Sequence, residues 1–458
     1  MEFDPELQAL IERFENNIKQ GIVQYYDTDE LETIIDCYLV ASQYDQARIA
    51  IDYACRLHPN SEKIKCIEAK LYLLEEKYVE ATKILESIPN PEPDYVAILA
   101  ECYIHTARYE ESKNLFNRYL TICNPKELPA IFTDIASLYN SYKQCSMALD
   151  FIDNGLALFP EHESLLIEKA IAYEELFEFE KAEETLTKII NINPYQHEIW
   201  GLLGSIQFRQ NKLTDALSSY EYALAINPDD EQAKLQRAHC LFNLGKFGEA
   251  VEPYKEYIEK NPGDDMIISF LAETYENLND WTNALYLYEQ AMAINPDVPV
   301  VWIGKACCLH NIGKLDEAYD TICSADEKFP QTLDIIYYRA LVEKDIAYET
   351  NQELYIIKAL NHFTKCLEFD PENTSICYET AIILLQYAEY DHARELLEIA
   401  YRKRSSFERI EIFLAIAYYG IGNVELAAKH LNIARETISN TDEIFLSVFP
   451  NAISFIKQ

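Results

Sequence analysis

Glycine and proline are scarce in this 458-residue sequence, with 11 and 17 residues respectively. No linker rich in either residue divides the chain, although a compact protein of this length usually forms several domains. Apolar runs are also short, and none approaches the roughly 20 residues that a membrane-spanning helix needs. The first residues, MEFDPELQALIERF, lack the basic and apolar segments of a secretory signal. We therefore expect one continuous body that works in the cytoplasm.

Positive charge is limited to 39 lysines and arginines against 77 aspartates and glutamates, which gives a net charge of -38. Such a charge disfavours binding to nucleic acids and to anionic membranes, so we expect neither as a partner. It weakly favours a basic partner. The simpler interpretation is that the acidic residues form a solvated outer face.

Motifs of catalytic and metal sites are absent from the sequence. No phosphate-binding glycine loop, H-E-x-x-H or G-x-S-x-G motif occurs, and the nine histidines are scattered singly. The twelve cysteines form no C-x-x-C pair, and Cys37, Cys102, Cys240 and Cys308 recur at one position of the periodic pattern described below. That recurrence indicates packing of small buried thiols. We expect no catalytic residue, no metal, no cofactor and no disulfide.

A helix hairpin is the unit that the sequence does contain. Residues 197–230 hold two runs of helical period, separated by the polar break at 210–212 and closed by Asn227 and Pro228. Prolines then recur at intervals of 34 residues at Pro160, Pro194, Pro228, Pro262, Pro296 and Pro330. Such a period indicates a tandem repeat, because one hairpin cannot bury both of its faces.

The hairpin resembles the tetratricopeptide repeat. The resemblance rests on the order of Trp200, Leu203, Gly204, Ala216, Tyr220, Ala223 and Pro228. It implies an all-α fold, a right-handed α-α superhelix of about twelve hairpins similar to the long bacterial arrays of this family. Gly204 and Ala216 should let the two helices approach closely, while Tyr220 fills the space beside them.

The expected organisation has three parts. Residues 1–27 are predicted to form a capping helix, 28–441 the superhelix, and 442–458 a capping or association segment. The predicted repeats lie near 28–60, 61–92, 93–128, 129–162, 163–196, 197–230, 231–264, 265–298, 299–332, 333–373, 374–407 and 408–441. The second repeat is about three residues short near Ile88, which should tighten or bend the stack locally.

The tenth repeat contains about seven extra residues, because Pro330 and Pro371 are separated by 41 residues. These residues fall between Glu343 and Lys358. One interpretation adds a turn to each helix of the hairpin. Another interpretation is a tolerated loop insertion. A third is that the extra residues protrude as a contact site.

Apolar residues recur at positions that line the concave face in this family, and the resemblance implies a partner-binding role for them. They are Ile303, Tyr337, Leu341, Tyr378, Ile382, Ile412 and Ile416. We predict a groove that binds an amphipathic helix or an extended apolar segment of a partner. The alternative is that a tighter stack buries these residues against the facing helices.

Three asparagines recur with the same period, each near the end of the first of the two helices expected in its hairpin. Asn243, Asn277 and Asn311 would present a ladder of amides to an extended peptide backbone. The alternative is that each asparagine only marks a helix end.

The carboxy-terminal segment is unusually apolar for a terminal cap. Phe445, Phe449, Ile453 and Ile456 lie on one helical stripe. Exposed apolar area favours association, so we predict that this segment forms a homodimer contact.

The expected function is a non-catalytic scaffold or adaptor that binds a protein or peptide segment of basic or apolar character. The alternative function is a regulatory or accessory subunit that positions a separate enzyme.

Overall fold

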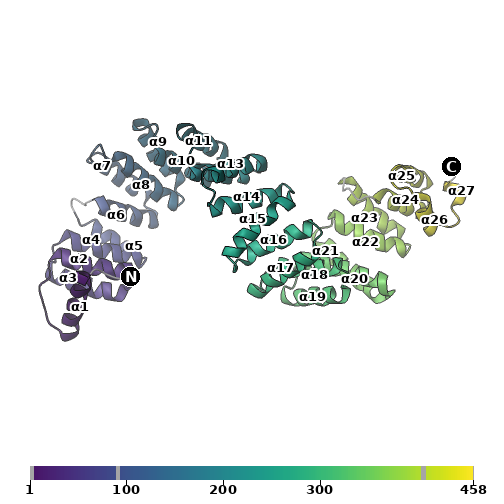
Figure 1. Cartoon of the computed structure of the whole chain (residues 1–458), viewed down its shortest axis with the longest axis horizontal. Helices are drawn as coiled ribbons and strands as arrows, with labels where there is room; N and C mark the ends of the chain where they lie inside the picture. The colour runs from purple at the N-terminus through teal and green to yellow at the C-terminus, as the bar shows by residue number, and fades with distance from the viewer. Residues whose placement is uncertain (1–4, 89–92, 404–408, 457–458) are drawn as a thin grey trace. The chain divides into compact units, whose positions relative to one another are not determined.

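The computed structural model describes residues 5–88, 93–403 and 409–456. Within these ranges every regular element is an α-helix and no strand occurs, which confirms the all-α prediction. The helices follow one another in chain order, as Figure 1 shows. No helix in the described ranges combines the length and the apolar character that crossing a membrane requires.

The chain forms two compact units, Met1–Asp230 and Glu231–Gln458, called unit 1 and unit 2 below. Unit 1 contains α1 (Pro5–Gln20), α2 (Thr28–Val40), α3 (Tyr44–Leu57), α4 (Glu62–Leu74), α5 (Tyr78–Leu85), α6 (Pro93–His105), α7 (Tyr109–Leu120), α8 (Leu128–Ser141), α9 (Cys145–Leu158), α10 (Glu163–Glu175), α11 (Phe179–Ile192), α12 (His197–Arg209) and α13 (Leu213–Ile226).

Unit 2 contains α14 (Glu231–Asn243), α15 (Phe247–Lys260), α16 (Asp265–Asn277), α17 (Trp281–Ile294), α18 (Pro299–Asn311), α19 (Leu315–Lys328), α20 (Leu333–Thr350), α21 (Glu353–Phe369), α22 (Thr374–Gln386), α23 (Tyr390–Arg402), α24 (Ile410–Gly420), α25 (Val424–Thr437), α26 (Thr441–Val448) and α27 (Ile453–Ile456).

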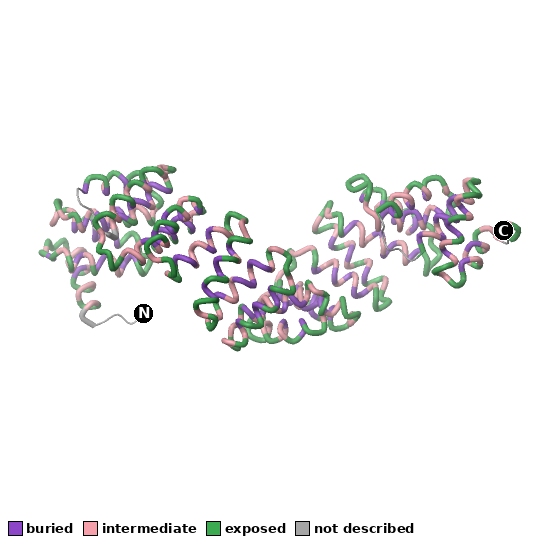
Figure 2. The backbone as a smooth tube through the Cα atoms, turned by 90° about the horizontal axis from the view of Figure 1, so that it is seen from above, coloured by how far each residue is buried: buried purple, intermediate pink, exposed green. Residues whose placement is uncertain are grey.

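From α2 to α25 the described helices pack as successive pairs, α2 with α3, α4 with α5 and so on. We call the members of each pair its first and second helix. Buried residues occur in every pair and alternate with exposed residues along each helix (Figure 2). This alternation is the helical period seen in the sequence, and it confirms the predicted hairpins.

The turn inside most pairs has one repeated geometry. A single residue adopts a left-handed conformation there, for example Ser42 with φ 55° and Phe177 with φ 60°. The next amide then bonds back to a carbonyl of the first helix, as Glu178 N does to Tyr173 O at 2.8 Å. This is a Schellman motif, which satisfies the last carbonyls of the first helix and reverses the chain.

Gly204 of α12 creates the close approach that the sequence predicts. A Cβ atom added at Gly204 would lie 2.9 Å from the Tyr220 ring of α13. Tyr220 is buried, so its ring has little room to move. The two helices of this pair therefore fit together only because position 204 carries no side chain.

Replacing Gly204 with alanine should lower the stability of the α12 and α13 pair. Overpacking costs about 1 to 3 kcal/mol, while alanine offsets about 1 kcal/mol through its helix propensity. Gly201→Ala in the same helix is the matched control, because nothing lies within 4 Å of a Cβ atom added there. Urea denaturation should show a net loss for Gly204→Ala and a gain for Gly201→Ala. Equal gains in both variants would contradict the close approach.

The seven extra residues of the tenth repeat lengthen both of its helices. α20 has 18 residues and α21 has 17, whereas the preceding pair, α18 and α19, has 13 and 14. Only Asn351 and Gln352 join the two longer helices. The interpretation of lengthened helices is therefore confirmed, and the interpretation of a loop insertion is wrong.

The helix α1 packs against the first pair through Phe14. Phe14 is buried and meets the rings of Tyr26 and Tyr53 edge to face, with centroids 5.6 and 5.5 Å apart. The side chains of Leu10, Ile11 and Ile18 are partly buried against the same cluster. α1 therefore covers apolar residues of the first pair.

Candidate functional site

The first helices of unit 2 lie closer together than its second helices. In its described residues, α16 contacts α18, α18 contacts α20 and α22 contacts α24, whereas no two successive second helices make comparable contact. A stack whose first helices are closer curves toward them. We call the side formed by the first helices the inner surface of unit 2.

Five of the seven predicted apolar residues are half-buried in unit 2. They are Ile303, Tyr337, Leu341, Tyr378 and Ile382, which we call the apolar inner patch. The Tyr337 ring lies 6.1 Å from Phe363 of α21, and the Tyr378 ring lies 5.9 Å from Phe413 of α24. Each tyrosine therefore packs on the core on one side and keeps part of its surface open to solvent.

Ile412 and Ile416 do not belong to that patch, and their assignment to an open groove is wrong. Their exposed fractions are 0% and 2%. Both residues sit in α24, which is packed between α22, α25 and α26. They therefore form part of the core of the last pair.

The three asparagines are exposed, and each donates a hydrogen bond to its own helix. Nδ2 of Asn243, Asn277 and Asn311 lies 2.8, 2.8 and 2.9 Å from the backbone oxygen four residues earlier. The bond holds each side chain against the last turn of its own first helix. The helix-end interpretation explains these bonds, and the amide ladder stays a prediction that would use the remaining donor and acceptor of each side chain.

An ion network that the sequence did not predict joins three first helices. Lys344 of α20 lies 2.7 Å from Glu379 of α22. Asp345, the next residue of α20, lies 2.8 Å from Nε2 of His310 in α18. Burial raises the pKa of Asp345, but the His310 hydrogen bond and Lys344 outweigh it and hold that pKa below its usual value. The network fixes the register of three pairs next to the apolar inner patch.

The α16 end of the inner surface is acidic. Glu276 accepts hydrogen bonds from Tyr288 OH at 2.9 Å and from Cys307 Sγ at 3.3 Å. Burial and the nearby Glu276 charge raise the pKa of Glu273. No lysine, arginine or histidine of the described ranges lies within ion-pair distance of Glu273. A cation placed here would relieve the repulsion between the two carboxylates.

A buried cluster beside the inner surface involves the lengthened pair. The carboxylate of Glu343, which is fully buried, lies 3.1 Å from Nε of Arg339 and 2.7 Å from Nδ1 of His362. Arg339 also pairs with Asp326 of α19 at 2.5 Å. These groups are satisfied by one another, so the cluster ties α19, α20 and α21 together. Across the described ranges, no group of three or more metal-binding side chains has an arrangement that could hold an ion.

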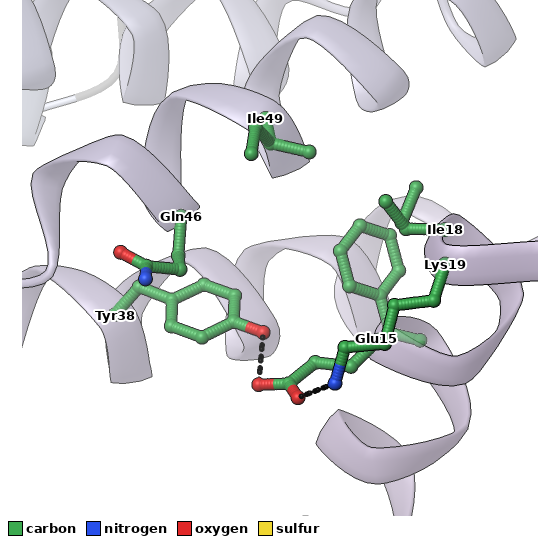
Figure 3. A pocket seen from close by; sticks show the side chains of 7 residues that line it. Glu15, Ile18, Lys19, Tyr38, Gln46 and Ile49 are labelled. Carbon is green, nitrogen blue, oxygen red and sulfur yellow. Dashed lines mark hydrogen bonds and ion pairs between the residues drawn. The ribbon is translucent and has the colours of Figure 1, made fainter.

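A second candidate site lies in unit 1, between α1 and the first pair. The pocket there has a volume of about 350 Å³. Figure 3 shows Ile18, Ile49 and Tyr38 among the side chains that line it. Oε1 of Glu15 accepts from Tyr38 OH at 3.3 Å, and Oε2 accepts from Lys19 at 3.2 Å. Because the Glu15 carboxylate is already paired, none of the described lining residues offers an uncompensated charge to a ligand.

The carboxy-terminal stripe is mostly covered by the last pair. Phe445 is fully buried, and Phe449 and Ile456 are partly buried against the same cluster. Ile453 remains 51% exposed. The prediction of an exposed stripe is therefore wrong for Phe445, because the residue packs into the core as part of a cap. Association through Ile453 stays a prediction.

Comparison with known proteins relates the chain to one repeat family. Profiles described as tetratricopeptide repeat match residues 164–196, 198–265 and 277–344. The BBSome complex member BBS4 homolog of Drosophila melanogaster is 22% identical over 218 residues, which cover 47% of this chain and 44% of that protein. Human protein O-mannosyl-transferase TMTC1 is 30% identical over 104 residues, which cover 22% of this chain and 12% of that protein. The chain thus spans less than half the length of these curated relatives.

Two solved structures are among those to which the chain is similar. A tetratricopeptide repeat protein from Parabacteroides merdae is 22% identical, with a TM-score of 0.46 over 55% of this chain and 97% of that one. The APC/C hetero-tetramer Cut9-Hcn1 is 14% identical, with a TM-score of 0.44 over 99% of this chain and 96% of that one.

Proposed function

Because the chain is a tetratricopeptide repeat protein, and such proteins are scaffolds for protein interaction, we propose that the inner surface of unit 2 binds a segment of a partner protein. The observation that carries this proposal is the apolar inner patch. Five large apolar side chains remain half-buried on adjacent first helices. Apolar area gathered on one face of an otherwise acidic chain is typical of an interaction site.

The partner segment should be apolar and should carry at least one lysine or arginine. Each apolar side chain that it buries on the patch contributes about 1.5 to 3 kcal/mol before the cost of ordering. Glu273 and Glu276 lie on α16, two pairs before Tyr337 on α20, and their carboxylates favour a cation at that end. A basic, amphipathic segment therefore matches both features of the surface.

Replacing Tyr337 and Tyr378 together with serine should abolish most partner binding. Loss of two aromatic contacts should weaken binding by at least about tenfold, since each 1.4 kcal/mol corresponds to a factor of ten. The full-length protein and the variant would be used to capture partners from native cell extract, followed by quantitative mass spectrometry. The control is Tyr286→Ser with Tyr401→Ser, which removes exposed tyrosines from the second helices α17 and α23.

Thermal stability and partner capture, measured on the same variants, distinguish a binding role of the two tyrosines from a core role. Unchanged thermal stability with loss of a captured protein supports the proposal. A large loss of thermal stability would assign Tyr337 and Tyr378 to the core, and equal capture by both variants would exclude the patch as the binding surface. Stoichiometric recovery of a single enzyme would favour an accessory subunit over a scaffold for several clients.

A further inference from the structure

The second helix of the second pair is much shorter than its counterparts. α5 has 8 residues, whereas α9, α11, α13, α15, α17 and α19 each have 14. This repeat is about three residues short, and α5 already ends at Leu85. As a result α5 lacks between one and two of the helical turns that the longer second helices have. In most of the regular pairs the second helix contacts the first helix of the following pair.

The shortened helix leaves an open cavity of about 490 Å³ between the end of α5, α6 and α7. Its floor is apolar, with Leu85, Val96 and Leu99 all buried. Leu115 and Tyr119 of α7 form a wall, and Ile122 is 77% exposed at the rim. The volume lies within the range of about 300 to 1,000 Å³ that is common for ligand sites. We call this feature the α5 cavity.

The Arg118 side chain at the rim of the α5 cavity has no counter-charge among the residues that the structure describes. Nε of Arg118 donates to the backbone oxygen of Asn114 at 3.3 Å, and no described carboxylate lies within ion-pair distance of its guanidinium. Glu86, which also lines the cavity, is already bound by Arg108 at 3.0 Å and by Tyr103 OH at 3.0 Å. In a chain with about twice as many acidic as basic residues, the cavity thus presents, beside apolar walls, a guanidinium that no described carboxylate pairs.

We propose that the α5 cavity binds a short amphipathic helix of a second protein, which inserts apolar side chains and places an aspartate or glutamate against Arg118. A helix fits because the cavity lies at the end of α5, where the second helices of the regular pairs continue for between one and two further turns. An acidic residue fits because a guanidinium binds a carboxylate with two parallel hydrogen bonds. This site lies in unit 1 and is independent of the inner surface of unit 2, so the protein can hold two different partners.

The test uses the full-length chain and two short helix-stapled peptides that differ only in charge. Both peptides carry leucines four residues apart, flanked by glutamates in one and by lysines in the other. Fluorescence anisotropy should show that the acidic peptide binds at least about tenfold more tightly, as expected for a charge-assisted contact. Ile122→Ser and Arg118→Glu should each weaken its binding about tenfold, and Arg118→Glu should strengthen binding of the basic peptide.

The matched controls are Leu158→Ser, at a similarly exposed helix end on α9, and Lys126→Glu, an exposed cation outside the cavity lining. Neither control should change binding. Because Ile122 and Arg118 are exposed, their variants should fold, and circular dichroism checks this. Equal binding of the two peptides, binding of neither, or insensitivity to Ile122→Ser would overturn the proposal. A dimer of the chain that Ile122→Ser dissociates would assign the cavity to a second copy instead.

Discussion

Phe445→Ala should destabilise the last helix pair by about 3 to 5 kcal/mol, the usual cost of deleting a buried aromatic ring. Phe445 is fully buried, and its ring lies 5.3 to 5.6 Å from the rings of Tyr419, Phe449 and Phe455. The cavity left by alanine would loosen α26 from α24. Amide hydrogen exchange of α24 to α26 should therefore accelerate strongly, which mass spectrometry can follow helix by helix.

Ile453→Ala is the matched control for Phe445→Ala. Ile453 belongs to the same sequence stripe but is half exposed, so alanine there should change stability by less than about 0.5 kcal/mol. Sedimentation of the two variants then separates capping from association. If Ile453→Ala dissociates a dimer without loosening α26, the segment serves association as well as capping. If Phe445→Ala leaves exchange unchanged, the assignment of Phe445 to the core is wrong.

Glu343→Ala should cost about 3 kcal/mol of stability in the lengthened pair. Removing one partner of a buried ion pair typically costs about 3 to 5 kcal/mol, because the remaining charge stays buried without compensation. The lower end applies here, since Arg339 keeps Asp326 and the Arg339 and His362 side chains are each 22% exposed. We expect faster hydrogen exchange in α20 and α21.

Glu349→Ala, at an exposed position near the end of α20, provides the control for Glu343→Ala. It should leave exchange in both helices unchanged, because surface substitutions rarely shift stability by more than about 0.5 kcal/mol. Exchange is preferable to a single melting curve, since the pairs of a repeat chain need not unfold together. Similar behaviour of the two variants would show that the buried carboxylate does not stabilise the pair.

The hairpins were predictable because their determinants lie within one repeat. Gly204, Ala216 and Tyr220 stand in the order that is typical of the repeat. The structure places Tyr220 against Gly204, as that order implies. The lengthened pair was also visible in the spacing between Pro330 and Pro371. Both features depend on helical period and short-range packing, which the sequence reports directly.

Features that depend on contacts between elements were not predictable. Ile412 and Ile416 occupy the same repeat positions as Tyr337 and Leu341, and only the structure shows that they are buried in the core around α24. The partners of Glu343 come from two helices, and nothing in the sequence around Glu343 indicates that its charge is buried. The left-handed turn residues were missed for a related reason, since Phe177 carries no local signal of that conformation.

The α5 cavity was likewise predictable only in part. The sequence revealed that the second repeat is about three residues short and predicted a tighter or bent stack. The structure places the loss in the second helix, which ends at Leu85. Which apolar side chains then line the opening depends on how α6 and α7 pack, and a period count cannot supply that.

The pairing of each helix with its neighbour in the sequence has a consequence for how the protein is made. Each described pair from α2 to α25 closes through a turn of a few residues, and most pairs also contact the next pair along the chain. Such a chain can fold progressively on the ribosome, because each pair can settle soon after its residues emerge. Short sequence separation between contacting residues also favours rapid folding. A nascent chain can therefore begin to fold before its carboxy terminus is synthesised. Unburied apolar surface is then confined mainly to the most recently synthesised pair.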